Sequence, residues 1–305
     1  MSYISNIFLW LRNFSGSAIL LCVGIAILLF LVEAALYSRK NTKNDIRRIA
    51  VITGASSGLG ELFARRIDEK YSNIDEIWLI ARRKDRLDEV AKSLHKSVKV
   101  LKLDLTSDTA IQDLKDALTD NSVRVGLFVN AAGFGKIGNY EKISETDQLN
   151  MIDLNCRAAV ATTLAVLPYM QAGDHIIEIC STAAFQPLQH MNIYAASKSF
   201  LYNYTRALRL ELLPRKIVVT AVCPWWIKDT EFIGVARDGN SASAAAIKGF
   251  PLSARKEKIV RRALLASRIG LAVVTPDVMS FFHRIFAKIL PRKFMLYFWE
   301  VFRRL

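Results

Sequence analysis

The sequence predicts an α/β fold, a single doubly wound parallel sheet, with an N-terminal transmembrane helix and basic amphipathic helices at the C-terminus. Three observations support this prediction. From Arg48 onward, short apolar runs rich in β-branched residues alternate with charged helical stretches; a glycine-rich turn joins the first run to a helix; and a long apolar stretch precedes both. At 305 residues, the chain can form one large α/β domain with an appendage, and is too short for two such domains.

The N-terminal part divides into residues 1–16, a predicted transmembrane helix at 17–38 and a basic linker at 39–48. Ser17–Tyr37 has about the ~20 residues that cross a ~30 Å hydrocarbon core, and Glu33 is its only charge. The alternative is a cleaved signal peptide, but only Arg12 precedes the apolar stretch and five basic residues follow it within the linker. This asymmetry predicts a single-pass membrane anchor with the rest of the chain facing the cytosol.

The net charge of +14 raises nucleic acid as a partner, so the position of the charge matters. Nearly all the excess lies in 39–48 and 254–305, and residues 49–253 are close to neutral. A protein that binds nucleic acid needs a basic face on its folded body. Basic residues beside apolar segments favour anionic lipid headgroups instead, at about 1 kcal/mol per Lys or Arg near the surface. We therefore expect membrane lipid, and no nucleic acid, as a partner.

The predicted domain covers residues 49–276. Its strands are nearly continuous apolar runs, which is typical of strands buried on both faces of a sheet. The predicted strands are Ile49–Thr53, Glu76–Ala81, Val98–Leu103, Gly126–Asn130, His175–Cys180 and Ile217–Cys223. Helical stretches lie between them at Gly60–Tyr71, Arg86–Lys96 and Asp108–Leu118.

The cysteines and histidines do not indicate a metal site or a disulfide framework. Each cysteine lies in an apolar run, without a C-x-x-C pair, and is interpreted as a small buried hydrophobe. They are Cys22, Cys156, Cys180 and Cys223. The four histidines are scattered and show no metal-ligand spacing.

The C-terminal tail, residues 277–305, mixes aromatic residues with Lys and Arg. Pro291 should end or kink a helix, which predicts two short amphipathic helices. The pattern leaves two roles open: packing on the domain's own core, or resting on a bilayer and lining a lipid-facing entrance.

The glycine-rich turn Thr53–Gly60 follows the first predicted strand and opens a helix. Glycines let backbone N–H groups approach a pyrophosphate, and the helix N-terminus adds partial positive charge. The G-x-x-x-G-x-G spacing resembles the short-chain dehydrogenase/reductase family, and the resemblance extends over about Arg48–Pro291. It implies a Rossmann-type domain whose turn residues bind the cofactor: Gly54, Ser56, Ser57, Gly58, Leu59 and Gly60.

In that family, the residue that closes the second strand distinguishes the cofactors: an acid binds the NAD ribose, and a following Arg pairs with the 2′-phosphate of NADP. Here the segment reads Ile80-Ala81-Arg82-Arg83, so Arg82 indicates NADP(H). Alternatively, both arginines only solvate a loop. The resemblance also implies that Asp104 holds the adenine ring. It further implies that Asn130, Ala131 and Gly133 form the turn near the adenosine ribose.

Tyr194 and Lys198 are four residues apart in a predicted helix and therefore share one face. A nearby ammonium should lower the tyrosine pKa toward the working range of an acid or base. Ser181 precedes Tyr194 at the family's usual interval, and Asn155 matches the fourth family position. The resemblance implies that Ser181 and Tyr194 bind the substrate oxygen, and that Tyr194 gives it a proton. It also implies that Lys198 binds the nicotinamide ribose, and that Asn155 kinks its helix and holds a water that links the lysine to solvent.

One segment departs from the family pattern. After the sixth strand, Trp225 follows Pro224 where the family usually has Gly, and Thr230 is displaced by one residue from its expected position. Pro224 and Thr230 remain predicted cofactor contacts. Trp225 and Trp226 favour a flat or lipidic substrate, or else pack beneath a substrate loop. The region Trp225–Pro276 should determine the substrate, and its small, polar residues 240–246 suggest a mobile lid.

Together these features predict an NADPH-dependent carbonyl reductase acting on a hydrophobic, lipid or steroid-like ketone. The anchored layout looks like that of hydroxysteroid dehydrogenases, 3-ketoacyl reductases and ketosphinganine reductases. Two alternatives stay open: a sterol or retinoid alcohol dehydrogenase working in the oxidative direction, and a non-catalytic NADPH-binding membrane scaffold. The resemblance also implies a homodimer or homotetramer.

Overall fold

The computed structural model describes residues 46–237, 246–250 and 252–304. The predicted transmembrane helix at 17–38, the first 16 residues, residues 39–45 of the basic linker and residues 240–245 of the suggested lid lie outside the described residues. Among the helices that are described, none has the length and apolar character needed to cross a membrane. Asp45–Leu305 form one compact unit.

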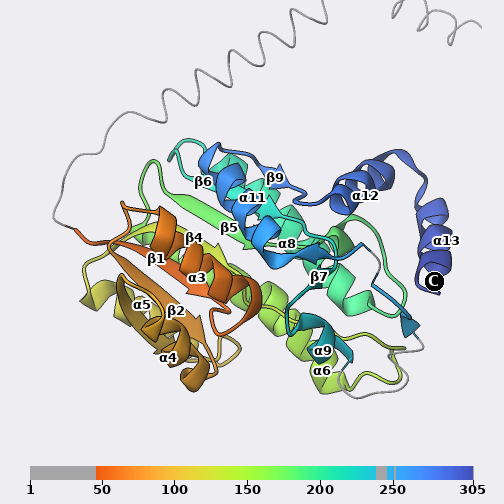
Figure 1. The fold of residues 1–305 in the computed structure, drawn as a ribbon, viewed down its shortest axis with the longest axis horizontal. Helices are drawn as coiled ribbons and strands as arrows, with labels where there is room; N and C mark the ends of the chain where they lie inside the picture. Colours follow the sequence, from red (N-terminus) through yellow and green to blue (C-terminus); the bar gives the residue numbers. More distant parts are fainter. Residues whose placement is uncertain (1–45, 238–245, 251, 305) are drawn as a thin grey trace, which may run out of the picture. The chain divides into compact units, whose positions relative to one another are not determined.

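The core of this unit is a parallel sheet of seven strands in the order β3-β2-β1-β4-β5-β6-β9 (Figure 1). The strands are β1 Arg48–Thr53, β2 Glu76–Ala81, β3 Ser97–Lys102, β4 Arg124–Asn130, β5 His175–Ile179, β6 Val218–Val222 and β9 Val273–Val274. The order reverses direction between β1 and β4, and in such sheets ligands bind at the carboxyl ends of the strands on either side of the reversal. The six predicted strands are confirmed to within two residues at each end, and β9 was not predicted.

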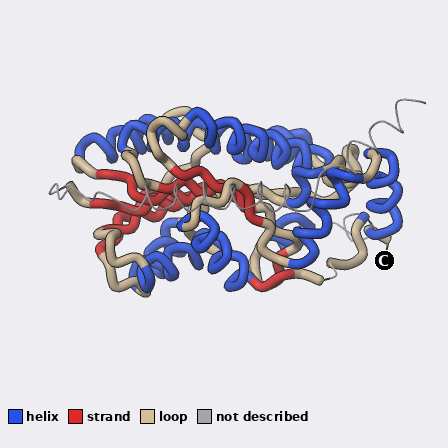
Figure 2. The backbone as a smooth tube through the Cα atoms, turned by 90° about the horizontal axis from the view of Figure 1, so that it is seen from above, coloured by secondary structure: helices blue, strands red, loops and turns tan. Residues whose placement is uncertain are grey.

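Helices cover both faces of the sheet, as Figure 2 shows with strands in red between layers of blue helices. Alternate side chains of β1 supply the two cores: Ala50 and Ile52 pack in one cluster, and Ile49 and Val51 in the other. The first cluster includes α3 Gly58–Lys70, α4 Lys84–Lys92 and α11 Lys256–Arg268. The second includes α5 Ala110–Asp120, α7 Ala159–Val166 and α8 Asn192–Glu211. The predicted doubly wound α/β sheet is therefore confirmed.

Two segments depart from regular elements close to the carboxyl edge of the sheet. Helix α6, Glu145–Ile152, continues into α7 through a π-helical turn at Asp153–Ala158. After β6 the chain forms the short parallel pair β7 Ile227–Lys228 and β8 Ala254–Arg255, and helix α9 Phe232–Arg237 follows β7. The π-helical turn lies where the family resemblance implies a kinked helix, at Asn155, whereas the β7–β8 pair and α9 were not predicted.

The tail forms two helices, α12 Val278–Ile289 and α13 Arg292–Phe302, separated at Pro291 as predicted. Asp277 caps α12 by accepting a hydrogen bond from the Ser280 backbone N–H. One face of α13 packs on the domain: Met295 and Trp299 are buried, and the Trp299 indole donates a hydrogen bond to the Gln189 carbonyl at 3.1 Å. Packing on the domain's own core is thus confirmed for this face.

Candidate active site

One pocket lies at the carboxyl ends of β1, β2, β4 and β5, where the sequence-predicted residues converge. Most of those residues line it. The lining includes Gly54, Ser56, Ser57, Gly58, Leu59, Gly60, Arg82, Asp104, Ala131, Gly133, Ser181, Tyr194, Lys198, Pro224 and Thr230. Asn130 and Asn155 do not belong to the lining and are buried behind it.

The glycine-rich turn leaves no room for side chains. Gly54 and Gly58 have φ of +66° and +60°, in the left-handed region that favours glycine. A Cβ added to Gly60 would lie 2.2 Å from the Gly54 carbonyl oxygen, so α3 can begin this close to β1 only with glycine there. The backbone of this turn is therefore exposed to the pocket at the start of α3.

The N-terminus of α3 suits a phosphate group. Its N-cap residue, Ser57, makes no side-chain capping hydrogen bond, so the side chain leaves the first backbone N–H groups of the helix available to an anion. Opposite, the Thr53 hydroxyl oxygen accepts hydrogen bonds from the N–H groups of Ala131 and Ala132, both at 3.0 Å, and donates to Asn130 Oδ1 at 2.8 Å. Asn130, predicted to contact the cofactor, does not line the pocket itself but accepts the Thr53 hydrogen bond behind the loop that does.

Two arginines lie beside the turn in different environments. The Arg82 side chain is 72% exposed, with its guanidinium 4.0 Å from the Asp104 carboxylate. Arg83 donates hydrogen bonds to the hydroxyls of Ser57 and Ser56 at 2.9 and 3.3 Å, and to the Glu231 carboxylate at 2.9 Å. The hydrogen bond from Arg83 to Glu231 and the positive charge of Arg83 lower the pKa of Glu231. Arg83 and Glu231 were not predicted as site residues, because their pairing joins segments that are far apart in the chain.

Asp104 lines the pocket beside Arg82. Burial raises its pKa, but hydrogen bonds from the Thr106 N–H and hydroxyl and the Arg82 charge outweigh this effect, so the net shift is downward. The carboxylate is therefore ionised and held in one orientation at neutral pH. That arrangement suits an acceptor for an exocyclic amine such as that of adenine.

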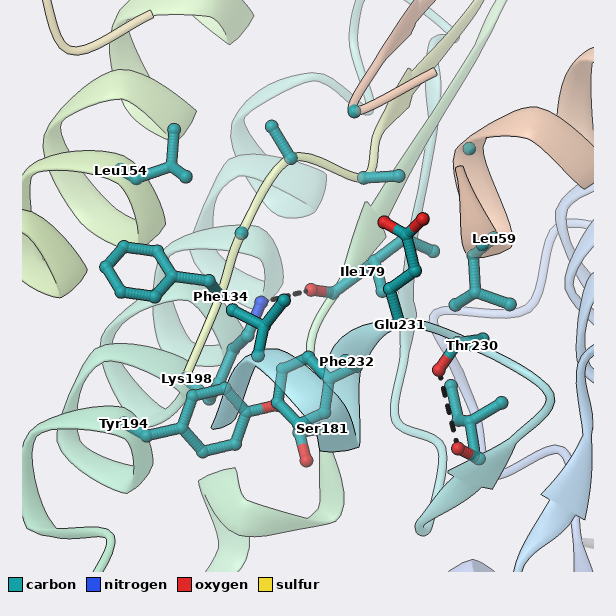
Figure 3. A pocket seen from close by; sticks show the side chains of 18 of the residues that line it. Leu59, Phe134, Leu154, Ile179, Ser181, Tyr194, Lys198, Thr230, Glu231 and Phe232 are labelled. Atoms are coloured by element: carbon teal, nitrogen blue, oxygen red, sulfur yellow. Dashed lines mark hydrogen bonds between the residues drawn. The ribbon is translucent and has the colours of Figure 1, made fainter. Parts of the chain in front are cut away.

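Tyr194, Lys198 and Ser181 come together from two elements (Figure 3). Tyr194 and Lys198 lie on α8, and Ser181 follows β5 and caps a short 3-10 turn. The Lys198 ammonium donates to the Ile179 carbonyl at 2.8 Å and lies 5.9 Å from the centre of the Tyr194 ring. The three side chains meet at one wall of the pocket, beside Phe232, whose ring centre is 5.4 Å from that of Tyr194.

The pKa of Tyr194 differs from the sequence-based expectation. Burial raises it to about 12, and the hydrogen bond with the Ser181 side chain offsets only part of that effect. The expected lowering of the tyrosine pKa by the Lys198 ammonium is not seen, and burial lowers the pKa of Lys198 itself. At neutral pH the phenol therefore keeps its proton.

Asn155 lies in the π-helical turn and is fully buried. Its Oδ1 accepts from the Phe134 N–H at 3.1 Å, and its Nδ2 donates to the Phe134 carbonyl at 2.9 Å and to the Ser197 hydroxyl at 3.0 Å. It thereby ties the loop after β4 to α8, which carries Tyr194 and Lys198. Single-turn π-helices are frequent at functional sites. In this structure, Asn155 is a positioning residue.

The remaining wall is aromatic. Trp225 and Trp226, predicted near the substrate, line the pocket together with Phe134 and Phe232. Thr230 also lines it, with its hydroxyl 3.4 Å from the Ile227 carbonyl.

The tail adds two further pocket residues, His283 of α12 and Trp299 of α13. The His283 ring packs against Trp225 at 5.3 Å, and burial lowers its pKa to about 4. Nothing local in the sequence links these two residues to the site, because the distant tail brings them there.

Comparison with known proteins agrees with this geometry. A family model described as short chain dehydrogenase matches residues 48–240. An uncharacterized oxidoreductase of Staphylococcus epidermidis is 33% identical over 182 residues, 58% of this chain and 76% of the relative. Sulfoacetaldehyde reductase 2 of Chromohalobacter salexigens is 35% identical over 206 residues, 65% of this chain and 80% of the relative. A solved short-chain dehydrogenase from Sphingobium yanoikuyae in complex with NADPH has a TM-score of 0.65 and 28% identity, and the match covers 76% of this chain and 88% of that one.

Proposed function

The chain belongs to the short-chain dehydrogenase family, and we propose that it is an NADPH-dependent reductase that converts a hydrophobic ketone to a secondary alcohol. The observation that carries this proposal is the convergence of Tyr194, Ser181 and Lys198 in a pocket that is also lined by aromatic side chains. The fold binds a nicotinamide cofactor. The choice of NADPH, the direction and the substrate class are parts of the proposal.

The preference for NADPH is supported by the end of β2. No acid is present there to accept hydrogen bonds from a ribose diol; Arg82 and Arg83 occupy the following positions. The exposed Arg82 guanidinium has only a 4.0 Å contact with Asp104, so it can turn toward a 2′-phosphate. The structurally similar Sphingobium dehydrogenase was solved with NADPH.

NADPH, when bound, supplies a hydride to the substrate carbonyl carbon. The hydroxyls of Ser181 and Tyr194 are placed to bind the carbonyl oxygen as negative charge develops on it. Tyr194 then gives its phenolic proton to that oxygen. A pKa of about 12 keeps this proton in place at neutral pH, which suits an acid in the reducing direction. In its protonated form Lys198, which donates a hydrogen bond to the Ile179 carbonyl, stabilises the phenolate as the proton leaves.

The substrate class follows from the aromatic wall and the proposed location. Trp225, Trp226 and Trp299 offer apolar surface for a flat or lipidic ketone. The apolar stretch at 17–38 supports the proposal of a single-pass anchor with the catalytic domain in the cytosol, since a tethered enzyme samples ketones dissolved in the bilayer. Assembly as a homodimer or homotetramer, as the family resemblance implies, also remains a proposal.

The test is cofactor oxidation by the detergent-solubilised full chain. NADPH and NADH are each offered with steroid ketones, 3-ketoacyl thioesters, ketosphinganine and, for contrast, sulfoacetaldehyde, and the alcohol product is identified by mass spectrometry. We expect turnover of a hydrophobic ketone with NADPH. Turnover of only the small polar aldehyde would refute the substrate class, and tight NADPH binding without turnover of any carbonyl would refute the reductase.

A further inference from the structure

The outer faces of α12 and α13 carry a dense set of exposed apolar side chains. These are Val278, Phe281, Phe282, Phe286 and Ile289 on α12, and Phe294, Leu296, Tyr297, Phe298 and Val301 on α13. Ile289 and Tyr297 are 73% and 74% exposed. Isolated exposed apolar residues are ordinary on a protein surface, but a set this large on two adjacent helices marks an interaction site (Figure 1).

The spacing shows that each helix has an exposed apolar face in addition to the face that packs on the domain. On α13, Phe294, Tyr297, Phe298 and Val301 recur at three- and four-residue intervals and share one face. The buried Met295 and Trp299 lie on the opposite face. The fold thus uses only one of the two faces.

Helix α12 repeats the arrangement. Val278, Phe282 and Ile289 share its outer face, and the buried Ser280 and His283 face inward. Phe282 and Phe286 stack with ring centres 6.1 Å apart. The described contacts leave the outer face of this helix uncovered as well.

Positive charge surrounds the apolar residues where the two helices meet. Lys288, Arg292 and Lys293 are exposed and form no salt bridge with any described residue. Glu300 is the only acid between residues 278 and 304, and Arg303 and Arg304 both pair with it. Exposed aromatic residues beside uncompensated cations match the boundary between anionic headgroups and acyl chains.

We propose that the outer faces of α12 and α13 dock on the surface of a bilayer that contains anionic lipid, with the aromatic residues at the headgroup boundary. Helices of 12 and 11 residues are too short to cross the ~30 Å core, so they lie along the surface. This contact is separate from any anchor formed by the apolar stretch at 17–38.

If the proposed function holds, docking of α12 and α13 also affects how the substrate reaches the pocket. The inner faces of the same helices contribute His283 and Trp299 to the pocket wall. Docking therefore brings one wall of the pocket to the membrane surface. A bilayer-dissolved ketone can then reach Tyr194 without crossing bulk water.

The test uses the full chain in vesicles of phosphatidylcholine with phosphatidylglycerol. Single variants Ile289→Cys and Tyr297→Cys carry an environment-sensitive fluorophore, and part of the lipid has brominated acyl chains that quench at short range. Lys92→Cys, on the exposed side of α4, is the matched control, and the labelled unsubstituted chain gives the background. We expect bromolipid quenching at residues 289 and 297 and none at 92. Quenching should weaken when phosphatidylglycerol is left out.

Two results would overturn the proposal. A label that stays in a water-like environment would show an undocked surface. A label that enters an apolar environment without bromolipid quenching would show that a second copy or the N-terminal segment covers the helices. In a second arm, Ile289→Asp/Tyr297→Asp should lose turnover of a bilayer-dissolved ketone and keep that of a water-soluble carbonyl; equal loss on both would count against substrate entry from the membrane. If the chain reduces no carbonyl at all, the proposed function fails, whereas quenching still decides the docking.

Discussion

Among single residues, Tyr194 provides a test of the proposed direction of the reaction. Reduction requires the phenol with its proton, and oxidation requires the phenolate. Because burial raises the pKa of Tyr194 to about 12, we expect the rate of ketone reduction to stay level between about pH 6 and about pH 9. Oxidation of the product alcohol should rise with pH over that range. Initial rates at saturating cofactor in both directions measure this. A reduction rate that falls around neutral pH, with Tyr194 as the titrating group, would show that the phenol ionises there.

Arg82 and Arg83 should have separable effects on the cofactor. Loss of a charge-assisted hydrogen bond costs about 1.5–3 kcal/mol, or roughly 10- to 100-fold in affinity. We expect Arg82→Gln to weaken the binding of NADPH by that factor and to leave the affinity for NADH unchanged. Arg83→Gln should weaken the binding of both cofactors, because Arg83 donates hydrogen bonds to the hydroxyls of Ser56 and Ser57 in the glycine-rich turn. Fluorescence titration with each cofactor tests this pair, and an unchanged NADPH/NADH ratio in Arg82→Gln would argue against phosphate binding by Arg82.

Among the elements, the start of α3 depends on Gly60. A Cβ there would lie 2.2 Å from the Gly54 carbonyl oxygen, so Gly60→Ala must displace the turn or the helix. We expect loss of cofactor binding and a destabilisation of about 1–3 kcal/mol from overpacking. Gly234→Ala, on α9 with nothing near the added atom, is the matched control and should keep cofactor binding without destabilising the chain, since Ala is favoured over Gly inside a helix. Chemical unfolding and cofactor titration of the two variants provide the comparison; equal behaviour would refute the close approach.

The π-helical turn offers a second test at this scale. Asn155→Ala removes three hydrogen bonds, two of them to the partly buried backbone N–H and C=O groups of Phe134, at up to about 1–3 kcal/mol for each group left unsatisfied. We expect a lower unfolding midpoint and a fall in kcat larger than any rise in the KM for NADPH, because the loop beside Tyr194 and Lys198 loosens. Asn203→Ala removes an exposed hydrogen bond to the Ser199 carbonyl on α8, and it should change neither the unfolding midpoint nor kcat. A change in stability without any change in kcat would limit Asn155 to a structural role.

The elements that could be predicted were those with strong local patterns. Strands such as Glu76–Ala81 are continuous apolar runs, and the candidate catalytic residues Tyr194 and Lys198 lie in one short motif. Strand β9 has only two residues and forms only because β6 presents an open edge to Val273 and Val274. The Arg83–Glu231 pair and the approach of His283 and Trp299 depend on contacts between distant segments, which no local pattern reports. The pKa of Tyr194 was wrongly anticipated for a related reason, since burial, a property of the whole fold, raises it.

For the molecule as a whole, buried histidines should make stability depend on pH. Burial lowers the pKa of both His175 and His283 to about 4, against 6.5 for the exposed side chain. Between those values the unfolded chain binds protons that the folded chain does not, so the free energy of unfolding falls as the pH falls. The loss is at most about 1.4 kcal/mol per pH unit for each histidine.

His283→Phe isolates one of these contributions, because its ring neighbours, Trp225 and Phe185, are aromatic. We expect the variant to lose less stability than the parent chain between about pH 6.5 and about pH 4, in chemical unfolding followed by tryptophan fluorescence. Parallel pH profiles for the two proteins would mean that His283 titrates normally.

The proposed chemistry is tested most directly by single-turnover reduction of a hydrophobic ketone by the full chain preloaded with NADPH, with Tyr194→Phe alongside. The variant keeps the aromatic ring that packs on Phe232 and lacks only the acid. We predict that it binds NADPH like the parent chain and reduces the ketone at least about 100-fold more slowly, the range expected for loss of a general acid. Equal rates in the two proteins would contradict proton donation by Tyr194, and intact NADPH binding without reduction by the parent chain would contradict the assignment as a ketone reductase.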